Sequence, residues 1–195
     1  MRRMILALGL ACAVGSGLQA QMVGTGTPVV VVPSLPTSCP SGYNLACTLE
    51  TWTTPASNVG TTTTVLATYT LPANTLSANG QSLEISGNFN TAANTNTKTW
   101  YGNFGAALLM GNATTNSGAS PRTLITVTRI SATTAWITAD SNFESSIAQG
   151  NNSLFTGFDF TAPIVFTYSG KSSAASGDIT FEEGKVQWLP AGGLN

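Results

Sequence analysis

The stretch that decides the fold is Thr64–Phe89, TVLATYTLPANTLSANGQSLEISGNF. It holds two segments in which apolar and polar residues alternate, and a turn-rich segment joins them. Alternation with a period of two is typical of β-strands that bury one face. The faces expected to point inward carry Val65, Ala67, Tyr69 and Leu71 in the first segment and Leu83, Ile85 and Phe89 in the second. The stretch therefore predicts two half-buried strands.

The joining segment is rich in residues that favour turns. Pro72 and Asn74 predict a turn directly after the first strand, and Asn79-Gly80 supplies the positive φ angles that precede the second. Leu76 lies between these turns and is expected to fold back as an apolar plug. The segment thus fixes the register between the two strands.

The alternating pattern continues towards the C-terminus. Further strands are predicted at Thr97–Phe104, Arg122–Ile130, Thr133–Ala139, Pro163–Tyr168 and Asp178–Leu189, with a shorter one near Leu49–Thr53 or Ala106–Met110. The segment Ser141–Gln149 is expected to form one or two helical turns between strands. Roughly eight strands predict an all-β fold for residues 61–195: an antiparallel two-sheet sandwich that is jelly-roll-like.

The N-terminal part of the sequence has a different composition. Residues 1–21 combine a basic start, the apolar run Met4–Val14 and a small residue, Ala20, which is typical of a secretory signal peptide; an apolar anchor is the alternative. Residues 22–60 are rich in proline and threonine, and we interpret them as an extended arm. Within this arm, Cys39 and Cys47 bracket a short loop that is expected to close as a disulfide if the protein is exported. In a reducing compartment they are expected to be two free thiols.

The charge of the chain excludes several classes of protein. Only 8% of the residues are charged, the formal net charge is −1, and the basic residues are scattered. Nucleic-acid binding needs clustered Lys and Arg, so we expect no nucleic-acid partner. The chain has no His, which excludes Ser-His-Asp and Cys-His arrangements. We predict no catalytic residues and no cofactor.

Two weaker site hypotheses come from spacing and residue type. Asp140, Asn142 and Glu144 form a D-x-N-x-E string of oxygen ligands suited to calcium, although the string lacks the glycine and distal Glu of an EF-hand loop. Among the aromatic residues, Trp136, Trp100 and Tyr101 are candidates for an interface or receptor contact. Trp136 is preferred, because its neighbour Ile137 must take the opposite face of their strand.

Part of the sequence resembles a known module. The motif TYTLPANTLSANG, the loop Ala92–Lys98 and the closing segment Ser176–Gly192 resemble a β-sandwich that recurs in virion proteins of tailed bacteriophages, especially tail fibres, spikes and head-decoration proteins. The resemblance covers roughly Thr64–Pro190. It implies a jelly-roll-like fold, a homotrimer and a place on the particle surface.

These observations lead to a functional expectation. We expect a non-enzymatic structural protein of the virion that docks through its N-terminal arm to other virion proteins, displays the sandwich outward and contacts a host-surface glycan. No membrane partner is expected for the mature form. The alternative is a secreted or cell-surface bacterial adhesin or carbohydrate-binding module, exported by an N-terminal signal peptide. A carboxylate-dependent glycan hydrolase is a third, weaker hypothesis.

Overall fold

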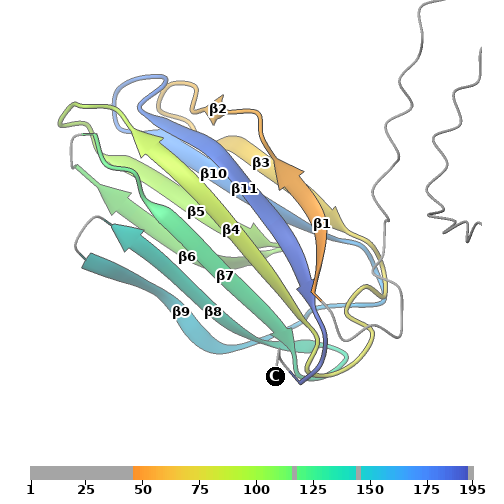
Figure 1. Cartoon of the computed structure of the whole chain (residues 1–195). Helices are drawn as coiled ribbons and strands as arrows, with labels where there is room; N and C mark the ends of the chain where they lie inside the picture. The colour runs from red at the N-terminus through yellow and green to blue at the C-terminus, as the bar shows by residue number, and fades with distance from the viewer. Residues whose placement is uncertain (1–45, 116–117, 144–145, 193–195) are drawn as a thin grey trace, which may run out of the picture. The chain divides into compact units, whose positions relative to one another are not determined.

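The structure is a computed structural model that describes residues 46–115, 118–143 and 146–192. These ranges contain eleven β-strands and no helix (Figure 1). The strands are β1 (Cys47–Trp52), β2 (Ala56–Ser57), β3 (Thr64–Leu71), β4 (Ser82–Thr91), β5 (Lys98–Phe104), β6 (Ala107–Thr114), β7 (Arg122–Arg129), β8 (Thr134–Phe143), β9 (Ser146–Thr156), β10 (Ile164–Ser172) and β11 (Ile179–Leu189). None of the described residues forms a helix long and apolar enough to cross a membrane.

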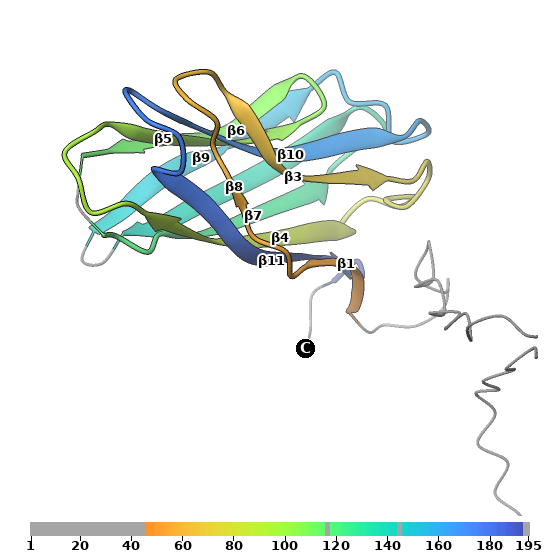
Figure 2. The same cartoon turned by 90° about the horizontal axis from the view of Figure 1, so that it is seen from above.

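The strands form two antiparallel sheets that face each other (Figure 2). The large sheet has the order β1-β11-β4-β7-β8-β9, with β2 also paired to β11, and the small sheet has the order β3-β10-β5-β6. Without β2 and the β8–β9 hairpin, each sheet keeps four strands in the order of a jelly roll, 1-11-4-7 against 3-10-5-6. The predicted all-β, jelly-roll-like sandwich is therefore confirmed, and the β8–β9 hairpin widens its large sheet.

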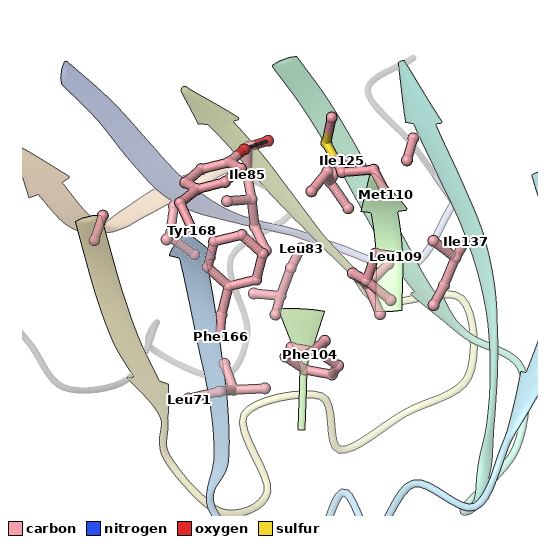
Figure 3. Packing of buried hydrophobic residues seen from close by; sticks show 14 of the residues in the cluster. Leu71, Leu83, Ile85, Phe104, Leu109, Met110, Ile125, Ile137, Phe166 and Tyr168 are labelled. Carbon is pink, nitrogen blue, oxygen red and sulfur yellow. Dashed lines mark hydrogen bonds between the residues drawn. The ribbon is translucent and has the colours of Figure 1, made fainter. Parts of the chain in front are cut away.

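The core fills the space between the two sheets (Figure 3). Its centre is the fully buried ring of Tyr168, whose centroid lies 4.8 Å from that of Phe166, 5.3 Å from Phe89 and 5.5 Å from Phe181. These rings come from β10, β4 and β11, so they join the two sheets. Because aromatic side chains bury large apolar areas, this cluster is a principal source of the stability of the sandwich.

A β-bulge changes the predicted face of one strand. The pairing of β3 with β10 shifts between Ala67 and Val65, so Leu66 is an extra residue in β3. As a result Leu66 and Ala67 are both buried, whereas Val65 is 57% exposed. The alternation of the sequence placed Val65 inside and Leu66 outside, and the bulge reverses both.

The sandwich begins before residue 61, because β1 and β2 lie within residues 22–60, which the sequence predicts to be an extended arm. Strand β1 pairs with β11, and the indole Nε1 of Trp52 donates a hydrogen bond to the carbonyl oxygen of Thr68 on β3, at 3.1 Å. Trp52 therefore bridges the two sheets at one edge. Residues 1–45, which hold the predicted leader, most of the predicted arm and Cys39, lie outside the described residues.

The segment Ser141–Gln149 also differs from its prediction. Its described residues lie on the paired strands β8 and β9 instead of in helical turns, with Ser141 paired to Ala148 and Asn142 to Ile147. The cross-strand hydrogen bonds of this hairpin satisfy the backbone groups that a short helix would leave unpaired at its ends.

The turn segment between β3 and β4 agrees with its prediction except at Asn79, whose φ angle is not positive. Leu76 is fully buried, and Asn74 and Gly80 have φ angles of 61° and 85°. The guanidinium of Arg129 donates a hydrogen bond to the carbonyl oxygen of Leu76, and the backbone N–H of Gly80 donates to the carbonyl oxygen of Arg129 at 2.7 Å. The segment is thus fastened to the end of β7.

Candidate functional site

The outer faces of the two sheets differ sharply in charge. On the large sheet, the side chains that alternate with the core residues include five charged ones, Glu84, Arg122, Asp140, Glu183 and Lys185. On the small sheet, the outward positions of the four strands include a single charged residue, Lys171. We call these surfaces the large-sheet face and the small-sheet face.

Strand pairing arranges the large-sheet face in rows. One row crosses β11, β4, β7 and β8 and consists, in that order, of Lys185, Ser86, Leu124 and Asp140. In the next row Glu183, Asn88, Arg122 and Asn142 occupy the same strands. Each row carries one charge of each sign, three strands apart in the first row and two strands apart in the second, so neither sign dominates the face.

The two rows line a groove. A hollow of about 630 Å³ lies over β4, β7 and β8, and a second of about 260 Å³ lies over β1, β11 and β4. Both hollows are lined by Ser86 and Asn88, so they adjoin, and together we call them the large-sheet groove. Its position explains why the sequence did not reveal it: the lining residues come from five strands and meet only through the register.

Several polar groups in the groove have no partner among the residues that the structure describes. The amide of Asn88 donates a hydrogen bond to the carboxylate of Glu183 at 2.8 Å. By contrast, the side chains of Arg122, Asp140 and Asn142 form no hydrogen bond or ion pair with any described residue. A guanidinium, a carboxylate and an amide thus face the same hollow with their hydrogen-bonding capacity free for a ligand or for water.

Trp136 lies further along β8 on the same face. Its side chain is 43% exposed, whereas Ile137 is fully buried, which confirms the orientation expected from the sequence. The register places it between Thr128 on β7 and Leu154 on β9, and Leu154 is also exposed. The ring therefore stands on the large-sheet face with an apolar neighbour on one side.

The small-sheet face is mainly apolar and hydroxylated. Three aliphatic side chains on it are exposed: Val65 (57%), Leu108 (47%) and Val165 (45%). The same face carries the threonines Thr68, Thr70 and Thr167. The ammonium of Lys171 lies 5.9 Å from the centroid of the Tyr101 ring, a cation–π contact. Tyr101, a predicted contact residue, is half-buried on this face.

Trp100 is not on either outer face. It points into the core, where it is fully buried, and its ring centroid lies 6.1 Å from that of Phe89. Trp100 follows the period of β5, whose even-numbered residues from Lys98 to Phe104 are all buried. Because its side chain is not exposed, the prediction that Trp100 contacts a receptor or a partner surface is wrong. Trp100 packs in the core.

The remaining predicted site residues are only partly described. Asp140 and Asn142 lie on the same face of β8, but Glu144 lies outside the described residues. No group of three His, Cys, Asp or Glu residues suited to a metal ion occurs in the described part of the chain, and the calcium site stays a prediction. Cys47 is disulfide-bonded, and its pairing with Cys39, which lies outside the described residues, stays a prediction.

A buried polar cluster that no sequence motif indicates surrounds Asp178, which is 3% exposed. Its carboxylate accepts hydrogen bonds from the amide of Asn96 at 2.8 Å and from the hydroxyl of Ser172. Lys98 is fully buried nearby and donates a hydrogen bond to the carbonyl oxygen of Asn94. Burial raises the pKa of Asp178, but the hydrogen bonds and the charge of Lys98 outweigh it and hold the pKa below its ordinary value. The cluster is enclosed, and we assign it a structural role.

The chain is similar to known proteins only at the level of solved structures. No protein-family model and no curated protein matches the chain. The CBM2 module of the evolved Dit of Lactobacillus casei BL23 phage J-1 is 11% identical with a TM-score of 0.33, over 63% of this chain and 68% of that chain. A chain of infectious bursal disease virus, Gt strain, is 12% identical with a TM-score of 0.32, over 76% of this chain and 33% of that one. With TM-scores below 0.5, neither likeness supports a conclusion about this chain.

Proposed function

We propose that this chain is a non-enzymatic structural protein of a bacteriophage particle, a subunit of a tail fibre, a spike or a head decoration. In this role its sandwich associates with copies of itself through the small-sheet face, and its N-terminal arm docks to the particle. The observation that supports the proposal is the near absence of charge on the small-sheet face. Exposed Val65, Leu108 and Val165 stand on that face with one cation, Lys171.

Burial of this face against a copy is energetically favourable. Apolar area removed from water contributes about 25 cal/mol per Å², and burial of an unpaired charge opposes association strongly. The small-sheet face offers aliphatic side chains and threonine hydroxyls with one charge to accommodate, and Lys171 already contacts the Tyr101 ring. The large-sheet face would bring at least five charges into such an interface.

The proposed oligomer is a homotrimer. A closed rotational symmetry uses the same face in each subunit and leaves no open end for polymerisation. Three copies arranged around an axis would cover their small-sheet faces and leave their large-sheet faces directed outward. This arrangement suits a protein displayed on the surface of a particle.

Self-association is tested by the mass of the full chain in solution. Light scattering coupled to size-exclusion chromatography is expected to give three times the subunit mass. The double substitution Leu108→Lys and Val165→Lys places two charges on the small-sheet face and is expected to yield monomers. The matched control, Leu124→Lys, adds a charge to the exposed Leu124 on the large-sheet face and is expected to leave the trimer intact. A monomeric wild-type protein, or a trimer that survives the double substitution, rules out association through this face.

The place in the particle needs a separate experiment. Antibodies against the full chain, viewed by immunogold electron microscopy on purified phage particles, are expected to label the tail or the head surface. Particles that lack the chain by mass spectrometry would overturn the proposed function, whatever the oligomeric state in solution.

A further inference from the structure

We propose that the large-sheet groove and Trp136 form a binding site for an uncharged oligosaccharide. The inference concerns the face opposite to the one used for self-association, and it does not depend on the proposed oligomer. The juxtaposition that carries it is a groove with unpartnered polar side chains on the same sheet face as an exposed aromatic ring.

The polar groups in the groove match the hydroxyls of a sugar. Asp140 supplies an acceptor, Arg122 supplies donors and Asn142 supplies both, and none of these side chains is used by a described residue. A sugar hydroxyl is itself a donor and an acceptor, so it can satisfy each of these groups. Leu124 lies beside Asp140 in the same row and offers an apolar contact to the C–H face of a sugar ring.

The charge pattern of the face favours an uncharged ligand. Lys185 and Arg122 alternate with Asp140, Glu183 and Glu84 across the neighbouring strands. A polyanion would gain from the two cations but would meet repulsion and desolvation at the three carboxylates, and a polycation would meet the reverse. A neutral polyol accepts hydrogen bonds from the two cations and donates them to the carboxylates, so it meets no charge repulsion from either.

An extended peptide fits this site less well. Strands β4, β7 and β8 each have neighbours on both sides in the large sheet, so the backbone groups beneath the groove are already paired. A peptide strand gains most of its affinity on a sheet from pairing with a free edge, and the part of the groove that holds Arg122, Asp140 and Asn142 lies away from the edge strand β1. Side-chain recognition from the face of a sheet suits a ligand with many hydroxyls.

The position of Trp136 indicates a ligand longer than one sugar. Trp136 and Asp140 are four residues apart on β8, which corresponds to about 13 Å along the strand. Thr138 lies between them on the same face, opposite Thr126 on β7. An oligosaccharide that lies along β8 would stack one ring on Trp136 and place another in the groove, with the threonine hydroxyls beneath the linkage.

The test uses the full chain and three neutral polysaccharides, dextran, mannan and galactomannan, in native affinity electrophoresis. At least one of them is expected to retard the wild-type protein, whereas the anionic polymer polygalacturonate is not. Trp136→Ala and the double substitution Asp140→Asn with Asn142→Ala are each expected to weaken the retardation at least tenfold. Val59→Ala, at an exposed residue in the loop between β2 and β3, is the control and is expected to bind as the wild type does.

The outcomes are decisive in either direction when the variants are folded. Near-ultraviolet circular dichroism and the thermal midpoint of each variant check the fold. Absence of retardation by all three neutral polymers, equal retardation by polygalacturonate, or undiminished binding by Trp136→Ala would each overturn the site. If no neutral polymer retards the protein but the trimer forms in solution, the sugar site is wrong and the proposed structural function is unaffected. If a neutral polymer retards the protein but the protein is monomeric, the sugar site is supported and the proposed self-association is wrong.

Discussion

The side-chain amide of Asn94 donates a hydrogen bond to the carboxylate of Asp178 at 2.7 Å, although the two residues are 84 positions apart. Asn94 belongs to the loop between β4 and β5, and Asp178 directly precedes β11. The same carboxylate accepts hydrogen bonds from Asn96 and Ser172, and the backbone N–H of Ala92 donates to the carbonyl oxygen of Asp178 at 2.8 Å. One buried residue therefore ties the β4–β5 loop to the loop that closes the sandwich.

Replacement of Asp178 should destabilise the fold far more than replacement of an exposed carboxylate. Asp178→Ala leaves the donors of Asn94, Asn96 and Ser172 and the buried charge of Lys98 uncompensated, which we expect to lower the free energy of unfolding by about 3 kcal/mol. Asp140→Asn is the control, because Asp140 is exposed, and it should change that free energy by less than about 0.5 kcal/mol. Urea unfolding followed by fluorescence measures both. Equal effects of the two substitutions on the free energy of unfolding would show that the buried cluster does not stabilise the fold.

The same cluster should make the stability depend on pH in the acid range. The pKa of Asp178 is lower in the folded protein than in the unfolded chain, so its stabilisation is complete above the unfolded value, about 4. The stabilisation is lost as the pH falls through the folded pKa. We therefore expect the difference in free energy of unfolding between the wild type and Asp178→Asn to be largest at pH 6 and to shrink below pH 4. The depressed pKa of Asp159 affects both proteins alike and cancels. A difference that stays constant with pH contradicts the prediction.

A tight backbone contact between β11 and β4 predicts a severe effect at a glycine. A Cβ atom on Gly184 would lie 2.4 Å from the carbonyl oxygen of Ser86 and 2.8 Å from the ring of Phe181. The carbonyl oxygen cannot retreat without disrupting the pairing of the two strands, so we expect Gly184→Ala to cost about 3 kcal/mol. Gly111→Ala on the edge strand β6 is the comparison, because there the nearest atom, at 3.3 Å, belongs to the side chain of Tyr101. Thermal unfolding of the two variants should give clearly different midpoints, with Gly184→Ala the lower.

Tyr168 should make the protein sensitive to alkali. Burial raises the pKa of its hydroxyl, although the hydrogen bond donated by Thr123 at 2.8 Å acts in the opposite direction. The unfolded chain therefore ionises first, so the contribution of Tyr168 is complete below pH 10 and is lost as the pH rises further. We expect Tyr168→Phe to lower the free energy of unfolding at pH 7 by about 1 kcal/mol. At pH 11 that deficit should shrink or reverse, as urea unfolding at the two pH values would show; a deficit unchanged at pH 11 counts against the assignment.

The sequence predicted the sandwich because its signals are local. The alternation of Leu83, Ile85 and Phe89 with polar residues reports directly which face of β4 is buried, and Asn79-Gly80 reports the preceding turn. The bulge at Leu66 carries no such signal, because it depends on how β10 pairs with β3. Local alternation therefore gave the strands but not every face.

The candidate site was harder to predict than the fold. Trp136 was placed correctly on an outer face because its neighbour Ile137 is apolar. The groove was not foreseen, because Ser86, Arg122 and Asp140 become neighbours only through the register of three strands. Buried Lys98 was missed for a related reason. A lysine in an alternating strand is ordinarily read as a surface residue, and the carboxylate that its charge stabilises, Asp178, lies far along the sequence.

The disulfide of Cys47 provides the last prediction. Cys47 is bonded at the start of β1, and the short loop between Cys39 and Cys47 is its predicted partner segment. Such a short closed loop is worth about 2 kcal/mol, because the bond restricts the unfolded chain. We expect Cys39→Ser, Cys47→Ser and the double substitution to lower the free energy of unfolding equally, because all three remove one bond, whereas Cys12→Ser should have no effect. Proteolysis without reductant, followed by mass spectrometry, should find the Cys39 and Cys47 peptides linked, and a link from Cys47 to Cys12 would refute the pairing.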